Sequence, residues 1–103
     1  MQSHKLIINP AAAMDIEDIV DYVIKMTSPK NGFNYETKMI SDINALRYSA
    51  SIEPQSHNKV ALRIHPEARI LPIMKRKWTV VFHLEDDYVV VDRIIASKYL
   101  GIV

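Results

Sequence analysis

The apolar residues of this chain change their period along the sequence, and this change constrains the fold more than any other feature. Between residues 16 and 23, isoleucines and valines recur at the spacing of one face of an α-helix. In the last third, residues 78–84 and 88–95 are rich in the valine, isoleucine and aromatic side chains typical of β-strands. Helical stripes followed by strand patterns predict an α+β fold.

A short strand and a helical hairpin are expected in the first half. Residues Lys5–Asn9 are typical of a strand, and Asn9-Pro10 starts a helix, with Asn as the N-cap and Pro at the first helical position. Thr27-Ser28-Pro29 interrupts the helical pattern, and Asn31-Gly32 extends the break. Apolar residues at 39, 40, 43 and 46 then restore helical spacing as far as about Tyr48, which predicts a second helix.

A three-stranded antiparallel sheet is expected in the second half, after a surface loop over 50–66. The strands are expected over 69–75, 78–84 and 88–95, with a tight hairpin turn at 85–87. Pro72 lacks an N–H for the ladder, so its strand is expected at an edge or to be bulged. Both helices are expected on one face of this sheet, because their apolar stripes need a shared core. Function is then sought on the other face, left open or covered by a partner.

The length and composition favour one domain over residues 1–103. There is no cysteine, which excludes disulfides, a cysteine nucleophile and a thiolate zinc site. The apolar run near the start, residues 6–8, is much shorter than a signal-peptide core or a membrane span. We therefore expect no export and no membrane, and a cytoplasmic location.

Charge is distributed unevenly although the formal net charge is only +1. Residues 1–58 hold five basic and seven acidic residues, whereas residues 59–103 hold eight and five. Six of the basic residues fall within 59–84 against one acidic residue, Glu67: Lys59, Arg63, Arg69, Lys75, Arg76 and Lys77. Such a run is typical of a phosphate-binding patch, and equally of a solvated basic loop. Lys75, Arg76 and Lys77 are its candidate phosphate ligands.

Arg93 is the charged residue whose position needs an explanation. We expect Trp78, Val80 and Phe82 to share one strand face. Val89, Val91, Arg93 and Ile95 are expected to share one face of the next strand. Arg93 would then lie among apolar neighbours and require an anionic or carbonyl partner. A phosphate ligand is one such partner, and a structural ion pair with Asp86, Asp92 or an acid of the first helix is the other.

Other chemistry has little support in the sequence. The four histidines, at 4, 57, 65 and 83, have no metal-ligand spacing, and no nucleotide-binding or serine-nucleophile motif occurs, so no metal and no cofactor are expected. His83 could act as a general acid or base, but a lone strand histidine is more often half-exposed.

Three segments carry a resemblance to a known family. LIINPAAA at 6–13, DIEDIVDY at 15–22 and YVVVDRII at 88–95 resemble, in order and spacing, the RelE/ParE superfamily of type II toxins. The resemblance covers nearly the whole chain and implies the same α+β fold. It also implies a working surface of basic residues on a concave sheet face.

Carried over by position, the resemblance implies four candidate catalytic residues: Arg69, Arg93, Lys98 and Tyr99. Many relatives have His or Tyr just after the last strand and an Arg pair soon after. Ala96-Ser97-Lys98-Tyr99 stands here instead, so a site centred on a histidine is not expected.

The resemblance implies a growth-inhibiting toxin that forms a hetero-oligomer with a cognate antitoxin. It leaves two targets open. A RelE-like toxin cleaves mRNA on the ribosome, with Arg and Lys stabilising the phosphate, whereas a ParE-like toxin binds and inhibits DNA gyrase. A silent relative that only binds antitoxin is the third alternative.

Overall fold

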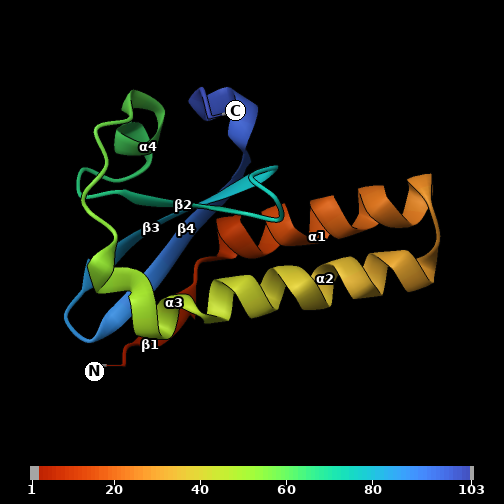
Figure 1. Cartoon of the computed structure of the whole chain (residues 1–103), viewed down its shortest axis with the longest axis horizontal. Helices are drawn as coiled ribbons and strands as arrows, with labels where there is room; N and C mark the ends of the chain where they lie inside the picture. Colours follow the sequence, from red (N-terminus) through yellow and green to blue (C-terminus); the bar gives the residue numbers. More distant parts are fainter. Residues whose placement is uncertain (1–2, 103) are drawn as a thin grey trace.

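The computed structural model describes residues 3–102 (Figure 1); the ends of the expected domain, residues 1–2 and 103, lie outside this part. The elements are β1 (Lys5–Ile8), α1 (Pro10–Met26), α2 (Pro29–Asn44), α3 (Leu46–Ser49), the 3-10 helix η1 (Ala50–Ile52), α4 (Lys59–Ile64), β2 (Arg69–Ile73), β3 (Trp78–Glu85), β4 (Tyr88–Ala96) and the 3-10 helix η2 (Ser97–Leu100). The expected α+β fold is confirmed.

The helical hairpin is present, and its break is shorter than expected. α1 ends at Met26 and α2 begins at Pro29, after Ser28, whose hydroxyl accepts a 3.2 Å hydrogen bond from the Asn31 N–H. The expectation that Asn31-Gly32 extends the break is wrong. Gly32 lies inside α2, at a point where α1 approaches so closely that a side chain does not fit. A Cβ atom on Gly32 would lie 2.2 Å from Cγ1 of Ile24.

The sheet has four strands in the order β1-β4-β3-β2. β2, β3 and β4 pair antiparallel as expected, and the N-terminal strand β1 joins the other side of β4 in parallel. The strand that contains Pro72 lies at the sheet edge, which confirms that expectation. Two residues, Asp86 and Asp87, form the tight turn between β3 and β4, and Asp86 has a φ of 54°.

Both long helices pack on one face of the sheet, as expected (Figure 1). The buried stripe of α1 meets Met39 and Ile43 of α2 and the inward side chains of β3 and β4, including Phe82. Met39, Ile43 and Phe82 are fully buried. Packing in this main core also sets the position of the ends of β3 and β4 relative to the helical hairpin of α1 and α2.

The other sheet face is covered by α4 and η2 of the chain itself, so the expectation that it is left open or covered by a partner is wrong. α4 and η2 pack there around Ala61, Ala68, Val81 and Leu100, so the loop assignment for 50–66 is wrong at η1 and α4. The side chain of Asn58 explains α4: its Oδ1 accepts from the N–H groups of residues 60 and 61. Its Nδ2 donates a 2.7 Å hydrogen bond to the Leu100 carbonyl, which ties α4 to the C-terminal tail.

A β-bulge in β4 changes the expected strand faces. Val81 pairs with Arg93 whereas Phe82 pairs with Val91, so Asp92 is the extra residue. The alternation is therefore reversed beyond Asp92. Val91 and Ile94 bury in the main core, Ile95 packs on the opposite face, and Arg93 is exposed. The expectation that Val89, Val91, Arg93 and Ile95 share one face is wrong, because Val89 and Val91 lie on the opposite side from Ile95.

Candidate functional site

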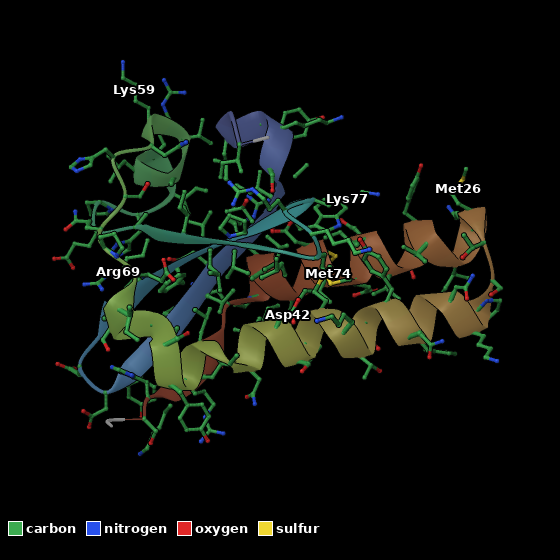
Figure 2. The ribbon with its side chains drawn as sticks, in the orientation of Figure 1. Met26, Asp42, Lys59, Arg69, Met74 and Lys77 are labelled. Atoms are coloured by element: carbon green, nitrogen blue, oxygen red, sulfur yellow. The ribbon has the colours of Figure 1, made fainter. Side chains whose placement is uncertain are left out.

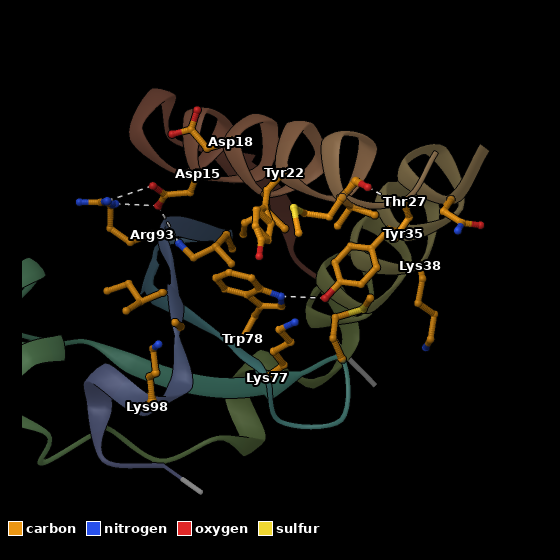
Figure 3. A pocket seen from close by; sticks show the side chains of 18 of the residues that line it. Asp15, Asp18, Tyr22, Thr27, Tyr35, Lys38, Lys77, Trp78, Arg93 and Lys98 are labelled. Carbon is orange, nitrogen blue, oxygen red and sulfur yellow. Dashed lines mark hydrogen bonds and ion pairs between the residues drawn. The ribbon is translucent and has the colours of Figure 1, made fainter. Parts of the chain in front are cut away.

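A groove of about 1190 Å³ lies between the helical hairpin and the ends of β3 and β4 (Figure 3). α1 contributes Tyr22 and Met26 to its lining, α2 contributes Tyr35, and β3 contributes Trp78. Tyr99, in the tail that follows β4, lines it as well. We call this the hairpin groove. Its apolar and aromatic lining is typical of binding sites.

The groove lining is anchored by Trp78. Its indole Nε1 donates a 2.8 Å hydrogen bond to the hydroxyl of Tyr35, which joins β3 to α2 (Figure 3). The indole has only this one donor, so the bond satisfies it and fixes the ring. Trp78 is therefore a structural anchor that also presents an apolar surface to the groove.

Two large apolar side chains of α1 remain exposed at the groove. Tyr22 is 58% exposed and Met26 is 66% exposed, although both follow shortly after the buried Ile19 and Val20. They are spaced four residues apart and lie beside the buried stripe. The sequence analysis overlooked them. The sequence pattern that could have revealed them is an apolar pair at helical spacing that lies outside the face of α1 that packs in the core.

The charged residues at the groove are partly paired within the chain. Lys38 forms a 2.8 Å ion pair with Asp42 on the same helix. The ammonium of Lys98 lies 5.2 Å from the centre of the Tyr99 ring, a cation–π contact. Lys77 also lines the groove, and it is exposed. Lys77 and Lys98 therefore place positive charge beside an apolar surface.

Arg93 is held by Asp15 of α1. Its Nε and one terminal nitrogen lie 2.7 and 2.9 Å from the two carboxylate oxygens, a two-point ion pair (Figure 3). Asp15 also accepts a 2.9 Å hydrogen bond from the backbone N–H of Ile94. The hydrogen bonds to Asp15 raise the pKa of Arg93 above its ordinary value. Among the acids named as possible ion-pair partners of Arg93, an acid of the first helix is the one that it contacts.

Arg69 is placed apart from the other candidate catalytic residues. Its guanidinium donates hydrogen bonds of 2.7 and 3.4 Å to the carbonyls of Glu53 and Ala50, at the ends of η1. Figure 2 shows Arg69 far from Lys77, toward the other end of the sheet. Arg93, Lys98 and Tyr99 all line the hairpin groove, but Arg69 is not part of this lining. The structure thus brings three of the four together.

The six cations that form one run in the sequence do not form one surface. Lys59 and Arg63 belong to α4, on the sheet face opposite the long helices. Lys59 and Lys77 lie well apart in Figure 2. Lys75, Arg76 and Lys77 are exposed in the turn between β2 and β3, at the side of the hairpin groove. These three candidate phosphate ligands are therefore together, and the rest of the run is elsewhere.

His83 forms a second polar cluster that the sequence did not predict. It is 6% exposed, so the expectation of a half-exposed histidine is wrong. Its Nδ1 lies 2.7 Å from Asp92 and its Nε2 lies 3.2 Å from Glu85. Asp92, the bulge residue, also accepts a 2.8 Å hydrogen bond from the Asn9 side chain. Burial opposes the charged imidazole, but the hydrogen bonds and charges of Asp92 and Glu85 outweigh it and raise the pKa of His83.

A second imidazole lies flat against the first. The rings of His65 and His83 stack with centres 3.6 Å apart and planes 4° from parallel. Nδ1 of His65 accepts a 3.0 Å hydrogen bond from the backbone N–H of Glu67, so this nitrogen carries no proton. The stack joins the end of α4 to β3. These contacts give the cluster a clear structural role on the sheet face away from the hairpin groove.

Asn9 illustrates how this cluster changes local structure. It occupies the N-cap position of α1 as expected, but its side chain makes no capping hydrogen bond. Its amide donates to Asp92 instead, while its backbone N–H donates to the Val91 carbonyl. The start of α1 is therefore fastened to β4.

Residues 3–102 contain no group of three or more His, Cys, Asp or Glu side chains arranged to hold a metal ion. Within the same range, the helices are all too short or too polar to cross a membrane.

Comparison with known proteins identifies the fold. No protein-family model matches the sequence, and no curated protein matches it. A chain in the solved structure described as "Chromosomal ParDE TA system from P. aeruginosa" is similar, with a TM-score of 0.78 and 17% identity. The match covers 91% of this chain and 96% of that chain. The two chains share a fold, which confirms the RelE/ParE-like expectation at the level of the fold.

Proposed function

We propose that this chain is the toxin of a type II toxin–antitoxin module and that its antitoxin binds in the hairpin groove. The fold shared with a chain of the ParDE toxin–antitoxin system supports this class of protein. The composition of the groove supports its role in binding. Tyr22 and Met26 expose apolar surface on α1, and Lys77 and Lys98 add positive charge beside it. The fitting occupant is an amphipathic antitoxin segment with acidic side chains.

We further propose that the toxin acts by binding its target and not by cutting RNA. The observation that carries this is the ion pair of Arg93 with Asp15. A phosphate-stabilising arginine must direct its donors at the substrate. Two donors of Arg93 already point at a carboxylate within the chain, and Arg69 donates to two backbone carbonyls. DNA gyrase, the target that the ParE-like resemblance implies, is the target we propose.

A ribosome-dependent nuclease is the second candidate, and one arrangement favours it. Arg93, Lys98 and Tyr99 line the same groove, so two cations and a phenol do lie around one space. A substrate phosphate would have to replace Asp15 as the partner of Arg93. The nuclease is our second choice because this replacement breaks an ion pair that also satisfies a backbone N–H.

Two assays of the purified chain decide between these activities. In the first, gyrase acts on relaxed plasmid, and we expect the chain to inhibit supercoiling. In the second, programmed ribosomes are incubated with the chain, and we expect uncut mRNA. Cleavage at the ribosomal A site with normal supercoiling would replace the gyrase proposal by the nuclease. Activity in neither assay would leave only antitoxin binding.

Antitoxin binding is tested separately. Expression of the chain alone should stop growth, and co-expression with the product of the adjacent open reading frame should restore growth and give a complex that co-purifies. Tyr22→Asp combined with Met26→Asp should prevent this complex, because both exposed side chains would place charge in an apolar groove. The matched control is Tyr48→Asp, at an exposed tyrosine outside the groove lining. Equal binding by both variants would show that the antitoxin binds elsewhere.

A further inference from the structure

The turn between β2 and β3 has an unusual backbone. Met74, Lys75 and Arg76 have φ values of 54°, 56° and 66°. This left-handed region crowds the Cβ atom against the following carbonyl, so glycine and asparagine are the residues that adopt it readily. Three consecutive residues of other types in this conformation are strained. Such strain persists where the surrounding structure imposes it, often at functional sites.

Packing explains one of these three residues. The Met74 side chain is partly buried against the main core, and it lines the hairpin groove (Figure 2 shows it above α2). The packing of the Met74 side chain against the core therefore accounts for the positive φ of this residue. Lys75 is exposed, so burial does not explain why a long cationic side chain stands where glycine would relieve strain. Lys75 and Arg76 line a smaller hollow that also contains Asp42 of α2, and Lys77, the next residue of the turn, lines the hairpin groove.

We infer that the turn Met74–Lys77 is a preformed cationic contact that recognises acidic side chains of the protein bound in the hairpin groove. This inference rests on the proposed function, since it names the chemistry of the segment that occupies the groove. The strained backbone of this turn holds Lys75 and Lys77 beside the apolar surface before the partner arrives. Less conformational freedom is then lost on binding. Lys75 and Lys77 set partner specificity through charge, while Tyr22 and Met26 supply apolar contact.

The distribution of cations favours an acidic protein over nucleic acid. A nucleic-acid strand is bound along a continuous track of positive charge. Here the basic run of the sequence is divided: Lys59 lies on α4 at the opposite sheet face, and Arg69 is bonded to backbone carbonyls. The turn concentrates charge at one side of an apolar groove, which suits an amphipathic peptide segment.

The inference predicts opposite effects of one substitution on stability and on binding. Lys75→Gly removes the Cβ crowding and also one positive charge. We expect its Tm to rise by about 2–4 °C, because glycine adopts this backbone without strain. Its Kd for the product of the adjacent open reading frame should increase about fivefold or more, measured by titration calorimetry at low salt. Lys75→Asn should behave similarly, since asparagine also tolerates the left-handed region.

Two matched variants separate charge from backbone. Lys75→Arg keeps the charge and the strain, so both Tm and Kd should remain near those of the original chain. Lys59→Ala removes one exposed lysine from α4 on the other sheet face, so its Kd should also be unchanged. Raising the salt concentration should weaken binding of the original chain more than binding of Lys75→Gly.

Each alternative result contradicts either this inference alone or the proposed function as well. If Lys75→Gly binds as tightly as the original chain, the turn is not a recognition element, although the antitoxin proposal stands. If its Tm falls, the backbone is not strained and the inference loses its basis. If the adjacent product does not bind the original chain, the proposed function and this inference both fail. A single-stranded oligonucleotide that binds more tightly than this product and depends on Lys75 would replace the acidic protein by nucleic acid.

Discussion

The guanidinium of Arg93 and the carboxylate of Asp15 face each other across the junction of β4 and α1, 78 residues apart in sequence. The Asp15 carboxylate makes two kinds of contact, because besides the ion pair it accepts a hydrogen bond from the backbone N–H of Ile94. The side chain of Asp15 is 13% exposed and that of Arg93 is 44% exposed. The acid is thus the more buried partner. Removing it leaves a backbone donor without its acceptor, whereas removing the arginine does not.

This asymmetry predicts unequal effects on stability. Asp15→Ala should lower the free energy of unfolding by about 1–3 kcal/mol, the usual range when a buried donor loses its partner. Arg93→Ala should lower it by about 1 kcal/mol or less, as for ion pairs near the surface. Urea unfolding of both variants measures the difference. Asp15→Asn serves as the control: its side-chain oxygen can still accept from Ile94, so its loss should be smaller than that of Asp15→Ala.

The sequence predicted those elements that long, regular patterns specify. Ile16, Ile19 and Val20 bury on the face expected for α1, and the strands of the second half occur where valine and isoleucine are dense. α4 was missed because six residues are too few to show a helical period, although Asn58 as a cap was a usable signal.

The parts of the site that escaped prediction depend on tertiary contacts. The bulge at Asp92 reverses the strand faces beyond it, and nothing in the alternating pattern marks it. The partners of Asp92, His83 and Asn9, are brought together only by the sheet. Arg93 could be recognised as needing a partner, but the choice of Asp15 over Asp86 or Asp92 required the structure.

The buried stripe of α2 can be tested by paired substitutions. Ile43 is fully buried, whereas Ile40 on the same helix is 40% exposed. Ile43→Ala should lower the free energy of unfolding by about 2–5 kcal/mol, from lost burial and the cavity it leaves. Ile40→Ala should lower it considerably less. Equal losses in urea unfolding at an unchanged slope would mean that the stripe is placed wrongly.

Gly32 should be intolerant of even one methyl group. In an isolated helix, alanine is favoured over glycine by about 1 kcal/mol. Here the Cβ atom of an alanine at position 32 would lie 2.2 Å from Cγ1 of Ile24, so the Ile24 side chain or the two helices would have to shift. Gly32→Ala should therefore destabilise the chain by about 1–3 kcal/mol, as measured by thermal or urea unfolding.

A compensating substitution checks the cause of that loss. Ile24→Ala removes Cγ1 and Cδ1, the two closest atoms that Gly32→Ala would meet, so the double variant should lose less stability than the two single losses together. Simple additivity would show that the two positions do not interact and that the helices already have room.

The buried imidazole of His83 predicts a pH dependence of stability. Asp92 and Glu85 raise the pKa of His83 in the folded chain, so the folded state binds this proton more tightly than the unfolded state. The resulting stabilisation is complete below the unfolded pKa of about 6.5. It is lost as the pH rises through the raised folded value. The stability that this proton contributes should therefore be greatest near pH 6 and decline toward pH 9.

Comparison with His83→Gln isolates this contribution, because titration of the other groups is largely shared. The difference in unfolding free energy between the original chain and His83→Gln should shrink as the pH is raised from about 6 to 9. Asp92→Asn should reduce the same pH dependence, since it removes the charge 2.7 Å from Nδ1 of His83. A difference that stays constant over this range would mean that His83 is not held as a charged partner of Asp92 and Glu85.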